Sequence, residues 1–220
     1  MTFSLDETAL KQWIEESIKN ETNTLAAGYQ GKTLLFDDGK NKYAIKIPHG
    51  KGLVRYFHTH MLRHEHEAYK RLGNDFPGRP ACYGLVDNKY LVLEYIAGRT
   101  IRMKRPLDEP EYMDMLLEII NNMHSHGVAH MDLKRKDNLL VTSNERPCLL
   151  DFGASVIEKH GFHPINHFKY RLAKQFDYNA WIKHKYHDRL DDISDEDRPL
   201  YKVTWTESIA SKIKSLYTKR

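Results

Sequence analysis

A short hairpin between two oxygen-bearing side chains constrains this chain more than any other feature. Two apolar runs, residues 139–141 and 148–150, flank a turn-rich segment and predict a β-hairpin. Asn138 enters the first strand and Asp151 leaves the second, and a hairpin brings its two ends together. An amide oxygen beside a carboxylate suits a hard cation such as Mg²⁺. Asp132 lies just upstream, close enough in sequence to act as a base beside that cation.

These residues resemble the catalytic segments of the protein kinase superfamily. The run from His130 to Asp132 matches the H-x-D of the catalytic loop, and Asn138 matches the asparagine that follows it. The run from Asp151 to Gly153 matches D-F-G. The resemblance implies an α+β, bilobal protein-kinase-like fold, with a small β-rich N-lobe and a minimal helical C-lobe.

The N-lobe is expected to cover residues 1–96, with an N-terminal helix, a twisted antiparallel sheet and the helix that the family calls helix C. The elements expected there are a helix capped by Asp6, strands near residues 33–36, 43–47 and 90–95, and a helix over 58–72 that ends at Gly73. Small residues at Ala97 and Gly98 mark the link to the second lobe.

The C-lobe is expected to cover residues 97–220, with the catalytic loop, the D-F-G hairpin and several helices. The helical segments run through residues 113–123 and 168–180, and a last one covers about 207–217. Asp177 resembles the buried aspartate that supports the catalytic loop, and His130 is expected to brace that loop. The two lobes together would form one kinase-like domain.

Lys46 lies in the middle of the strand Tyr43–Ile47, which resembles the V-A-I-K strand of kinases. Alternation along a strand places its side chain on the face opposite its isoleucine neighbours, where it needs an anionic partner. Glu65 and Glu67 are the candidates, and on a helix they point about 200° apart, so only one can face Lys46. We favour Glu65.

Two further segments resemble nucleotide-binding parts of the family. Ala26, Gly28 and Gly31 fit a G-x-G-x-x-G loop whose first glycine has become alanine, although an ordinary glycine-containing hairpin fits the same residues. The resemblance also implies a hinge in which Leu93 is the gatekeeper residue. The backbone carbonyl of Glu94 and the backbone amide of Ile96 would then bind the adenine edge.

The resemblance assigns the chemistry of phosphoryl transfer to the loop and the hairpin. Asp132 would accept the proton of the attacking hydroxyl, Lys134 would neutralise charge on the phosphoryl group, and Asn138 with Asp151 would hold Mg²⁺. Asn138 lies six positions after Asp132, where the family has five, and Asp137 stands in the expected slot. Either the loop has one extra residue or Asp137 is the ligand, and we favour Asn138 because it adjoins the strand.

These residues predict a phosphotransferase that uses ATP and Mg²⁺ to phosphorylate a hydroxyl acceptor. The chain has no A-P-E sequence and only about forty residues after Asp177, too few for the usual peptide-docking helices. It is most similar to the small microbial branch of RIO kinases and lipopolysaccharide core (Kdo or heptose) kinases, so the expected acceptor is a core sugar. The alternatives are a minimal RIO-like protein Ser/Thr kinase and a pseudokinase that binds nucleotide as a regulatory module.

Charge and hydropathy bear on partners and location. No apolar run approaches the roughly 20 residues that cross a bilayer, and no signal-peptide pattern begins the chain, so we expect a cytoplasmic protein. The net charge is +4, and the basic stretch at residues 211–220 fits either a solvated helix or peripheral contact with the anionic inner face of a membrane. We do not expect a nucleic-acid partner.

A group of four histidines lies in the predicted helix C region. His60 and His64 have the i, i+4 spacing of metal ligands, but a polar helix face with no metal explains the same pattern. The other two members of the group are His58 and His66.

Overall fold

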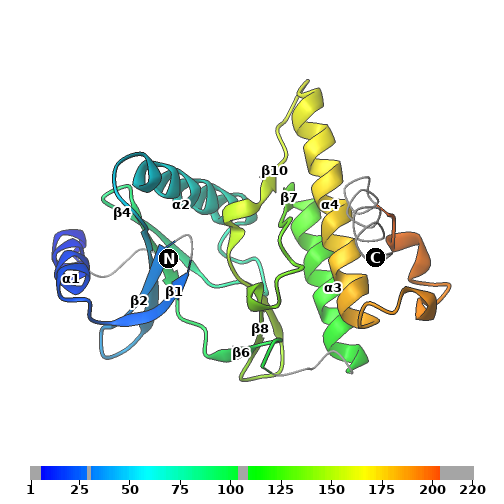
Figure 1. Ribbon diagram of the computed structural model, residues 1–220, viewed down its shortest axis with the longest axis horizontal. Coiled ribbons are helices and arrows are strands. Elements are labelled where there is room, and N and C mark those ends of the chain that lie inside the picture. The colour runs from blue at the N-terminus through cyan, green and yellow to red at the C-terminus, as the bar shows by residue number, and fades with distance from the viewer. Residues whose placement is uncertain (1–5, 29–30, 104–108, 204–220) are drawn as a thin grey trace, which may run out of the picture.

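The computed structural model describes residues 6–28, 31–103 and 109–203. Figure 1 shows a sheet with helix α2 on one side of the molecule and helices α3 and α4 on the other. The sheet is antiparallel, with strand order β1-β2-β3-β5-β4. Its strands are β1 (Thr24–Gly28), β2 (Gly31–Asp37), β3 (Lys42–Pro48), β4 (Cys82–Val86) and β5 (Tyr90–Glu94).

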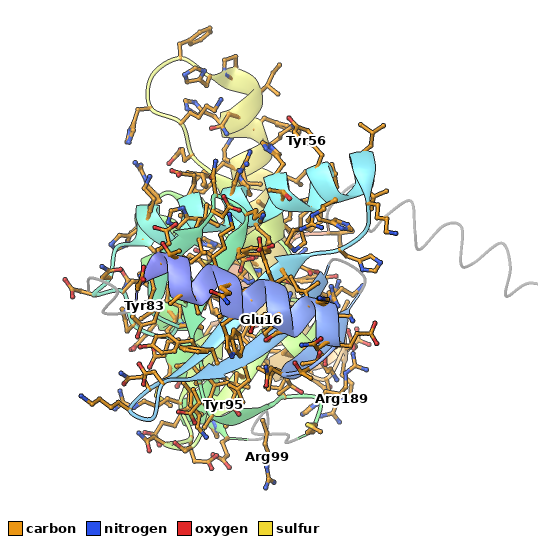
Figure 2. The ribbon with its side chains drawn as sticks, turned by 90° about the vertical axis from the view of Figure 1, so that its left-hand side faces the viewer. Glu16, Tyr56, Tyr83, Tyr95, Arg99 and Arg189 are labelled. Atoms are coloured by element: carbon orange, nitrogen blue, oxygen red, sulfur yellow. The ribbon has the colours of Figure 1, made fainter. Side chains whose placement is uncertain are left out.

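Alternation along the strands assigns the two faces of this sheet to different helices. Ile45 and Ile47 are buried in a cluster with Leu10 and Ile14 of α1 (Glu7–Asn20). Figure 2 shows α1 lying across this face, with Glu16 on its outward side. The opposite face, which carries Lys46, meets α2 (Gly52–Leu72). The expectation that Lys46 lies on the face opposite the isoleucines is confirmed.

The remaining elements form the second half of the molecule. They are β6 (Gly98–Thr100), α3 (Pro110–Ser125), β7 (Val128–Ala129), β8 (Leu139–Thr142), β9 (Pro147–Leu149), β10 (Val156–Ile157) and α4 (Pro164–Lys185). Helices α3 and α4 pack side by side (Figure 1), and the indole nitrogen of Trp181 donates to the carbonyl oxygen of Met113 at 2.7 Å. A second, larger apolar cluster runs from α2 through β5 and β8 to α4.

The fold confirms the predicted α+β class, with a β-rich first half and helices in the second. The helix capped by Asp6 is present, since the Asp6 carboxylate accepts from the Thr8 amide. The predicted hairpin is present as β8 and β9, with Leu139 opposite Leu149. The boundary that we drew after residue 96 falls between β5 and β6.

One predicted boundary was wrong. Helix α2 begins at Gly52, six residues before the expected start at 58. Its first turns carry exposed apolar side chains, Leu53, Val54, Tyr56 and Phe57, which follow no buried stripe and so gave no helical pattern. Figure 2 shows Tyr56 at the edge of the molecule. The end of α2 is as predicted, since Gly73, with φ of 79°, caps the helix.

Two expectations fall outside this description. The predicted helix at 207–217 and the basic stretch at 211–220 lie beyond the described residues. Within the described ranges, no helix is both long enough and apolar enough to span a bilayer.

The indole of Trp181 is only 1% exposed, so its removal tests the packing between α3 and α4. We expect Trp181→Ala to lower the free energy of unfolding by about 3–5 kcal/mol, because it leaves a cavity and removes the hydrogen bond from the indole to the Met113 carbonyl. Urea denaturation measures the change. The control is Phe168→Ala on the same helix, where the ring is 55% exposed and little change is expected. Equal losses in both variants would contradict this account of the core.

Candidate active site

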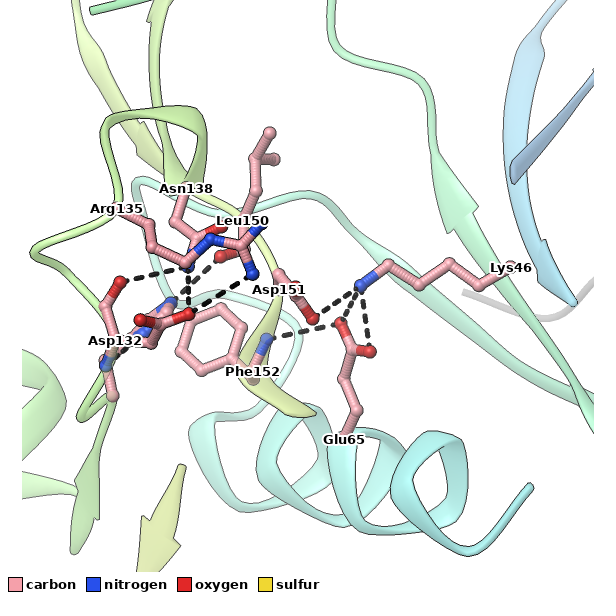
Figure 3. Close-up of polar contacts among 9 residues, drawn as sticks. Lys46, Glu65, Asp132, Arg135, Asn138, Leu150, Asp151 and Phe152 are labelled. Carbon is pink, nitrogen blue, oxygen red and sulfur yellow. Dashed lines mark hydrogen bonds and ion pairs between the residues drawn. The ribbon is translucent and has the colours of Figure 1, made fainter. Parts of the chain in front are cut away.

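The centre of the site is a network of three charged side chains from three segments of the chain (Figure 3), in which Glu65 is buried and Lys46 and Asp151 are partly buried. The Lys46 ammonium lies 2.7 and 2.9 Å from the two carboxylate oxygens of Glu65. It also lies 3.0 Å from Oδ1 of Asp151. The Phe152 amide donates to Glu65 at 3.3 Å. The expected pairing of Lys46 with Glu65 is therefore confirmed, while Glu67 pairs with a lysine on the outer face of α2.

The charges of this network set its protonation. Burial alone would lower the pKa of Lys46, but the carboxylates of Glu65 and Asp151 outweigh it and raise that pKa. Burial would raise the pKa of Asp151, but the Lys46 ammonium outweighs it and holds that pKa below its usual value. Lys46 and Asp151 are thus charged at neutral pH. For Glu65, burial dominates and raises the pKa in spite of Lys46.

The extra residue of the loop is absorbed in a short 3₁₀ turn, Lys136–Asn138. The side-chain nitrogen Nδ2 of Asn138 donates to both the backbone carbonyl oxygen and Oδ2 of Asp132, each at 3.0 Å. Asp137 turns outward and forms a two-pronged ion pair with Arg102, at 2.8 and 2.9 Å. Asn138 rather than Asp137 therefore lies beside Asp132, which is compatible with our choice of Asn138 as the ligand.

The hairpin places Asn138 and Asp151 at its two ends, where the Leu150 amide donates to the Asn138 carbonyl at 2.9 Å. Nδ2 of Asn138 donates to Asp132, so the side-chain oxygen Oδ1 of Asn138 is the atom that can ligate a cation. Asp151 uses Oδ1 for Lys46, and its second carboxylate oxygen is the atom that would ligate the same cation. Two hard oxygens of this kind fit Mg²⁺, which in kinases takes further ligands from phosphates and water. Mg²⁺ binding at this pair remains a prediction.

Asp177 of α4 holds the backbone of the catalytic loop. Its two carboxylate oxygens accept from the backbone amides of His130 and Met131, both at 2.8 Å. One of them also accepts from the ring of His124 at 2.9 Å. Met131 has φ of 68°, a left-handed conformation that costs free energy in a non-glycine residue. The carboxylate stabilises it, so the predicted supporting contact of Asp177 is confirmed.

The loop has two further supports. His130 donates from its ring to the Leu150 carbonyl at 2.9 Å, which braces the loop against the hairpin as expected. His184, which sequence reasoning missed, donates to the Leu133 carbonyl at 2.8 Å. Burial lowers the pKa of His184, so it is neutral at physiological pH. Helix α4 thus holds the loop at two points on one helical face.

The candidate nucleotide-binding residues lie on the sheet. Ala26 and Gly28 belong to β1, and Gly28 pairs with Gly31 of β2 across the hairpin. The two residues between these glycines, 29 and 30, lie outside the described part of the chain.

The candidate hinge follows β5. Leu93 is buried opposite Ala44, and Ile96 lies in the segment that leads to β6. The Glu94 carboxylate accepts from the Ala81 amide at 3.0 Å, and the Glu94 amide donates to the Ala81 carbonyl at 2.8 Å. The two bonds to Ala81 hold Glu94 in place, so the segment whose carbonyl and amide are proposed to meet adenine begins at a fixed position.

Lys134 is exposed and lines a pocket together with Asp132. The loop supplies one wall and α4 supplies the other; the full lining is Met131, Asp132, Lys134, Phe176, Asn179, Ala180 and Lys183. Sequence reasoning missed Lys183 because it lies about fifty residues from the loop. It also missed Arg135, whose guanidinium lies 3.8 Å from the Asp132 carboxylate.

Two of the four histidines of α2, His58 and His64, contact backbone carbonyls. The His58 ring donates to the His49 carbonyl at 3.1 Å, and the His64 ring donates to the Ser155 carbonyl at 2.7 Å. In the part of the chain that the structure describes, no three His, Cys, Asp or Glu side chains are grouped as a metal site. His64 instead ties α2 to the segment that follows Asp151.

Comparison with known proteins agrees with this geometry. A family model described as a protein kinase domain matches residues 31–193. The bovine (Bos taurus) serine/threonine-protein kinase greatwall is 28% identical over 142 residues, which cover 60% of this chain and 16% of that protein. Serine/threonine-protein kinase D of Synechocystis is 30% identical over 100 residues, covering 43% of this chain and 20% of that one.

A crystal structure of a kinase domain superposes with a TM-score of 0.54 and 16% sequence identity, covering 74% of this chain and 62% of the other. At that identity the likeness concerns the fold. The chain matches only about 16% of the length of the greatwall kinases, so it corresponds to a small part of those proteins.

The support of the catalytic loop can be tested through Asp177. We expect Asp177→Asn to lower the free energy of unfolding by about 2–4 kcal/mol, because the amide nitrogen would face a backbone N–H and could not accept from it. The His130 and Met131 amides should exchange with solvent faster, as hydrogen exchange followed by mass spectrometry or NMR would show.

Asp137→Asn is the matched control, since that carboxylate is on the surface and 43% exposed. It should leave both the unfolding transition and the exchange of the loop amides nearly unchanged. Unaltered exchange at His130 and Met131 in Asp177→Asn would refute the supporting role.

Proposed function

Because the chain belongs to the protein kinase domain family, we propose that it transfers the γ-phosphoryl group of ATP to a serine or threonine hydroxyl of a protein. The observation that carries this proposal is the joint placement of the Lys46, Glu65 and Asp151 network and the Asn138 contact with Asp132. Together they supply a phosphate-binding cation, two candidate metal ligands and a base within one site.

The nucleotide would bind between the sheet and the hairpin. Lys46 is held in place by two carboxylates and offers its charge to the phosphates. The β1–β2 hairpin with Gly28 and Gly31 would cover the phosphates, and the segment from Glu94 to Ile96 would meet the adenine. Mg²⁺, when bound by Asn138 and Asp151, supplies positive charge that offsets the phosphate oxygens.

In the transfer step, Asp132 accepts the proton of the acceptor hydroxyl. The hydroxyl oxygen forms a bond to the γ-phosphorus while the bond from that phosphorus to the β–γ bridging oxygen breaks, and ADP leaves. Asn138 and Arg135 orient the Asp132 carboxylate, and Lys134 offsets the charge of the moving phosphoryl group. The step depends on positioning and electrostatics, which explains why the site has no nucleophile of its own.

For the acceptor, the comparisons favour a protein over the lipopolysaccharide core sugar that the sequence led us to expect. The similar chains named above are serine/threonine-protein kinases, and none of them supports a sugar acceptor. The pseudokinase alternative drew on the extra residue after Asp132. Since Asn138 still reaches Asp132, that residue no longer supports it.

Nucleotide binding can be tested by thermal unfolding. We expect ATP with Mg²⁺ to raise the unfolding temperature of the wild type, because a ligand at 100 times its Kd adds about 2.7 kcal/mol of stability. Asp151→Asn should lose the part of this shift that requires Mg²⁺. Asp137→Asn, an exposed carboxylate of the same region, should keep it. A full magnesium-dependent shift in Asp151→Asn would contradict the assignment of the metal ligand.

Transfer itself can be tested with radiolabelled ATP and a panel of Ser/Thr peptides, generic proteins and core glycolipids. We expect peptide or protein phosphorylation that falls at least about 100-fold in Asp132→Asn, since a general base contributes 10² to 10⁴ in rate, with ATP binding retained. A wild type no faster than this variant on every acceptor would favour the pseudokinase. Transfer confined to glycolipids would restore the sugar acceptor.

A further inference from the structure

Two helix starts carry groups of exposed apolar side chains. The α2 tip consists of four side chains in the first turns of α2 that are at least 53% exposed: Leu53, Val54, Tyr56 and Phe57. The α4 tip consists of three, at and just before the start of α4, that are at least 55% exposed: Phe162, Ile165 and Phe168. Exposed apolar side chains that gather in this way mark an interaction surface. We propose that the two tips dock the protein on an anionic lipid bilayer.

The charges around the tips favour an anionic surface. Residues 39–64, which contain the α2 tip, include no Asp or Glu, and the same is true of residues 159–176, which contain the α4 tip. Lys51 is exposed directly before α2, and Lys169 and Arg171 are exposed on the first turns of α4. Apolar side chains among cations, with no anions between them, are what the interface of an anionic membrane attracts.

The two tips lie on the same side of the molecule. Figure 2 is turned from Figure 1 about the vertical axis, so heights in the two views correspond. The start of α4 is at the top of both views, and α2 lies high in both. Tyr56 lies on the upper side of α2 in Figure 2. One broad surface laid on this side can therefore meet both tips.

A bilayer suits this pair of tips better than a protein partner does. A protein interface has a packed core that matches its partner in shape, which calls for one continuous patch. The two tips are instead separate groups on two helices. The interface of a bilayer accepts separate aromatic and aliphatic side chains that project from a protein, and it favours aromatic ones. Tyr56, Phe57, Phe162 and Phe168 make both tips aromatic.

A second copy of the chain is the other occupant to consider. Two copies that met through their tips would bring Lys51, Lys169 and Arg171 of one copy toward the same residues of the other. Residues 39–64 and 159–176 supply no carboxylate to offset that repulsion. Anionic lipid headgroups supply the missing negative charge.

Sedimentation with lipid vesicles tests this surface on the full chain in the absence of ATP. We expect the wild type to bind vesicles of mixed phosphatidylcholine and phosphatidylglycerol at least about 10-fold more tightly than vesicles of phosphatidylcholine alone, since several basic residues act together. The double variant Tyr56→Ser, Phe57→Ser should bind the mixed vesicles about 10-fold more weakly, and so should Phe162→Ser, Phe168→Ser. These side chains are exposed, so urea unfolding should stay nearly unchanged.

Charge reversal supplies a second readout. The double variant Lys169→Glu, Arg171→Glu should also bind the mixed vesicles at least about 10-fold more weakly. Lys19→Glu is the charge control, because it changes an exposed lysine of α1, which covers the opposite face of the sheet from α2. Val203→Ser is the apolar control, because that side chain is 63% exposed and lies outside both tips. Both controls should bind as the wild type does.

Three results would overturn the inference. The first is equal binding to the two kinds of vesicle, or no binding to either. The second is binding that survives both serine pairs but is lost when the basic stretch at 211–220 is neutralised. That variant carries four substitutions: Lys212→Gln, Lys214→Gln, Lys219→Gln and Arg220→Gln. The third is a dimer in sedimentation equilibrium that the serine pairs dissociate, with no binding to vesicles, which would make a second copy the occupant.

Discussion

The ammonium of Lys46 between two carboxylates is the contact on which the site depends. It joins β3, α2 and the hairpin end that carries Asp151, three elements that are far apart in sequence. Glu65 is buried and the other two groups are partly buried, so their charges need partners, and removal of one group would leave the others unpaired. The three side chains carry one positive and two negative charges when ionised. The excess negative charge lies beside Asp151, where a divalent cation would offset it.

The second support of the site is α4, which acts on backbone groups. Asp177 and His184 bind amides and a carbonyl of the catalytic loop, so they hold its path whatever side chains it presents. The left-handed conformation of Met131 persists because the carboxylate accepts from its amide. The loop can therefore present Asp132 and Lys134 toward solvent and still keep one shape.

The sequence predicted what depends on local pattern. Two apolar runs predicted the hairpin, strand alternation placed Lys46, and helix geometry separated Glu65 from Glu67. The start of α2 could not be predicted, because its first turns expose their apolar residues and bury no stripe. His184 and Arg135 were missed for a different reason. His184 binds a backbone carbonyl about fifty residues away, and no periodic pattern reveals such a contact. Arg135 lies close to Asp132 only because of the path of the loop, which the sequence does not show.

The extra residue after Asp132 shows which parts of a catalytic loop are physically constrained. The loop is held at His130 and Met131 by Asp177, at Leu133 by His184, and at Asn138 by the hairpin. Between these contacts, residues 134–137 meet solvent, and a turn there can lengthen at little cost. Asp137 then pairs with Arg102 on the surface, and Asn138 bonds directly to Asp132. The contact between the candidate base and the candidate metal ligand therefore depends on the hairpin, and the number of residues between the two depends on the turn that joins them.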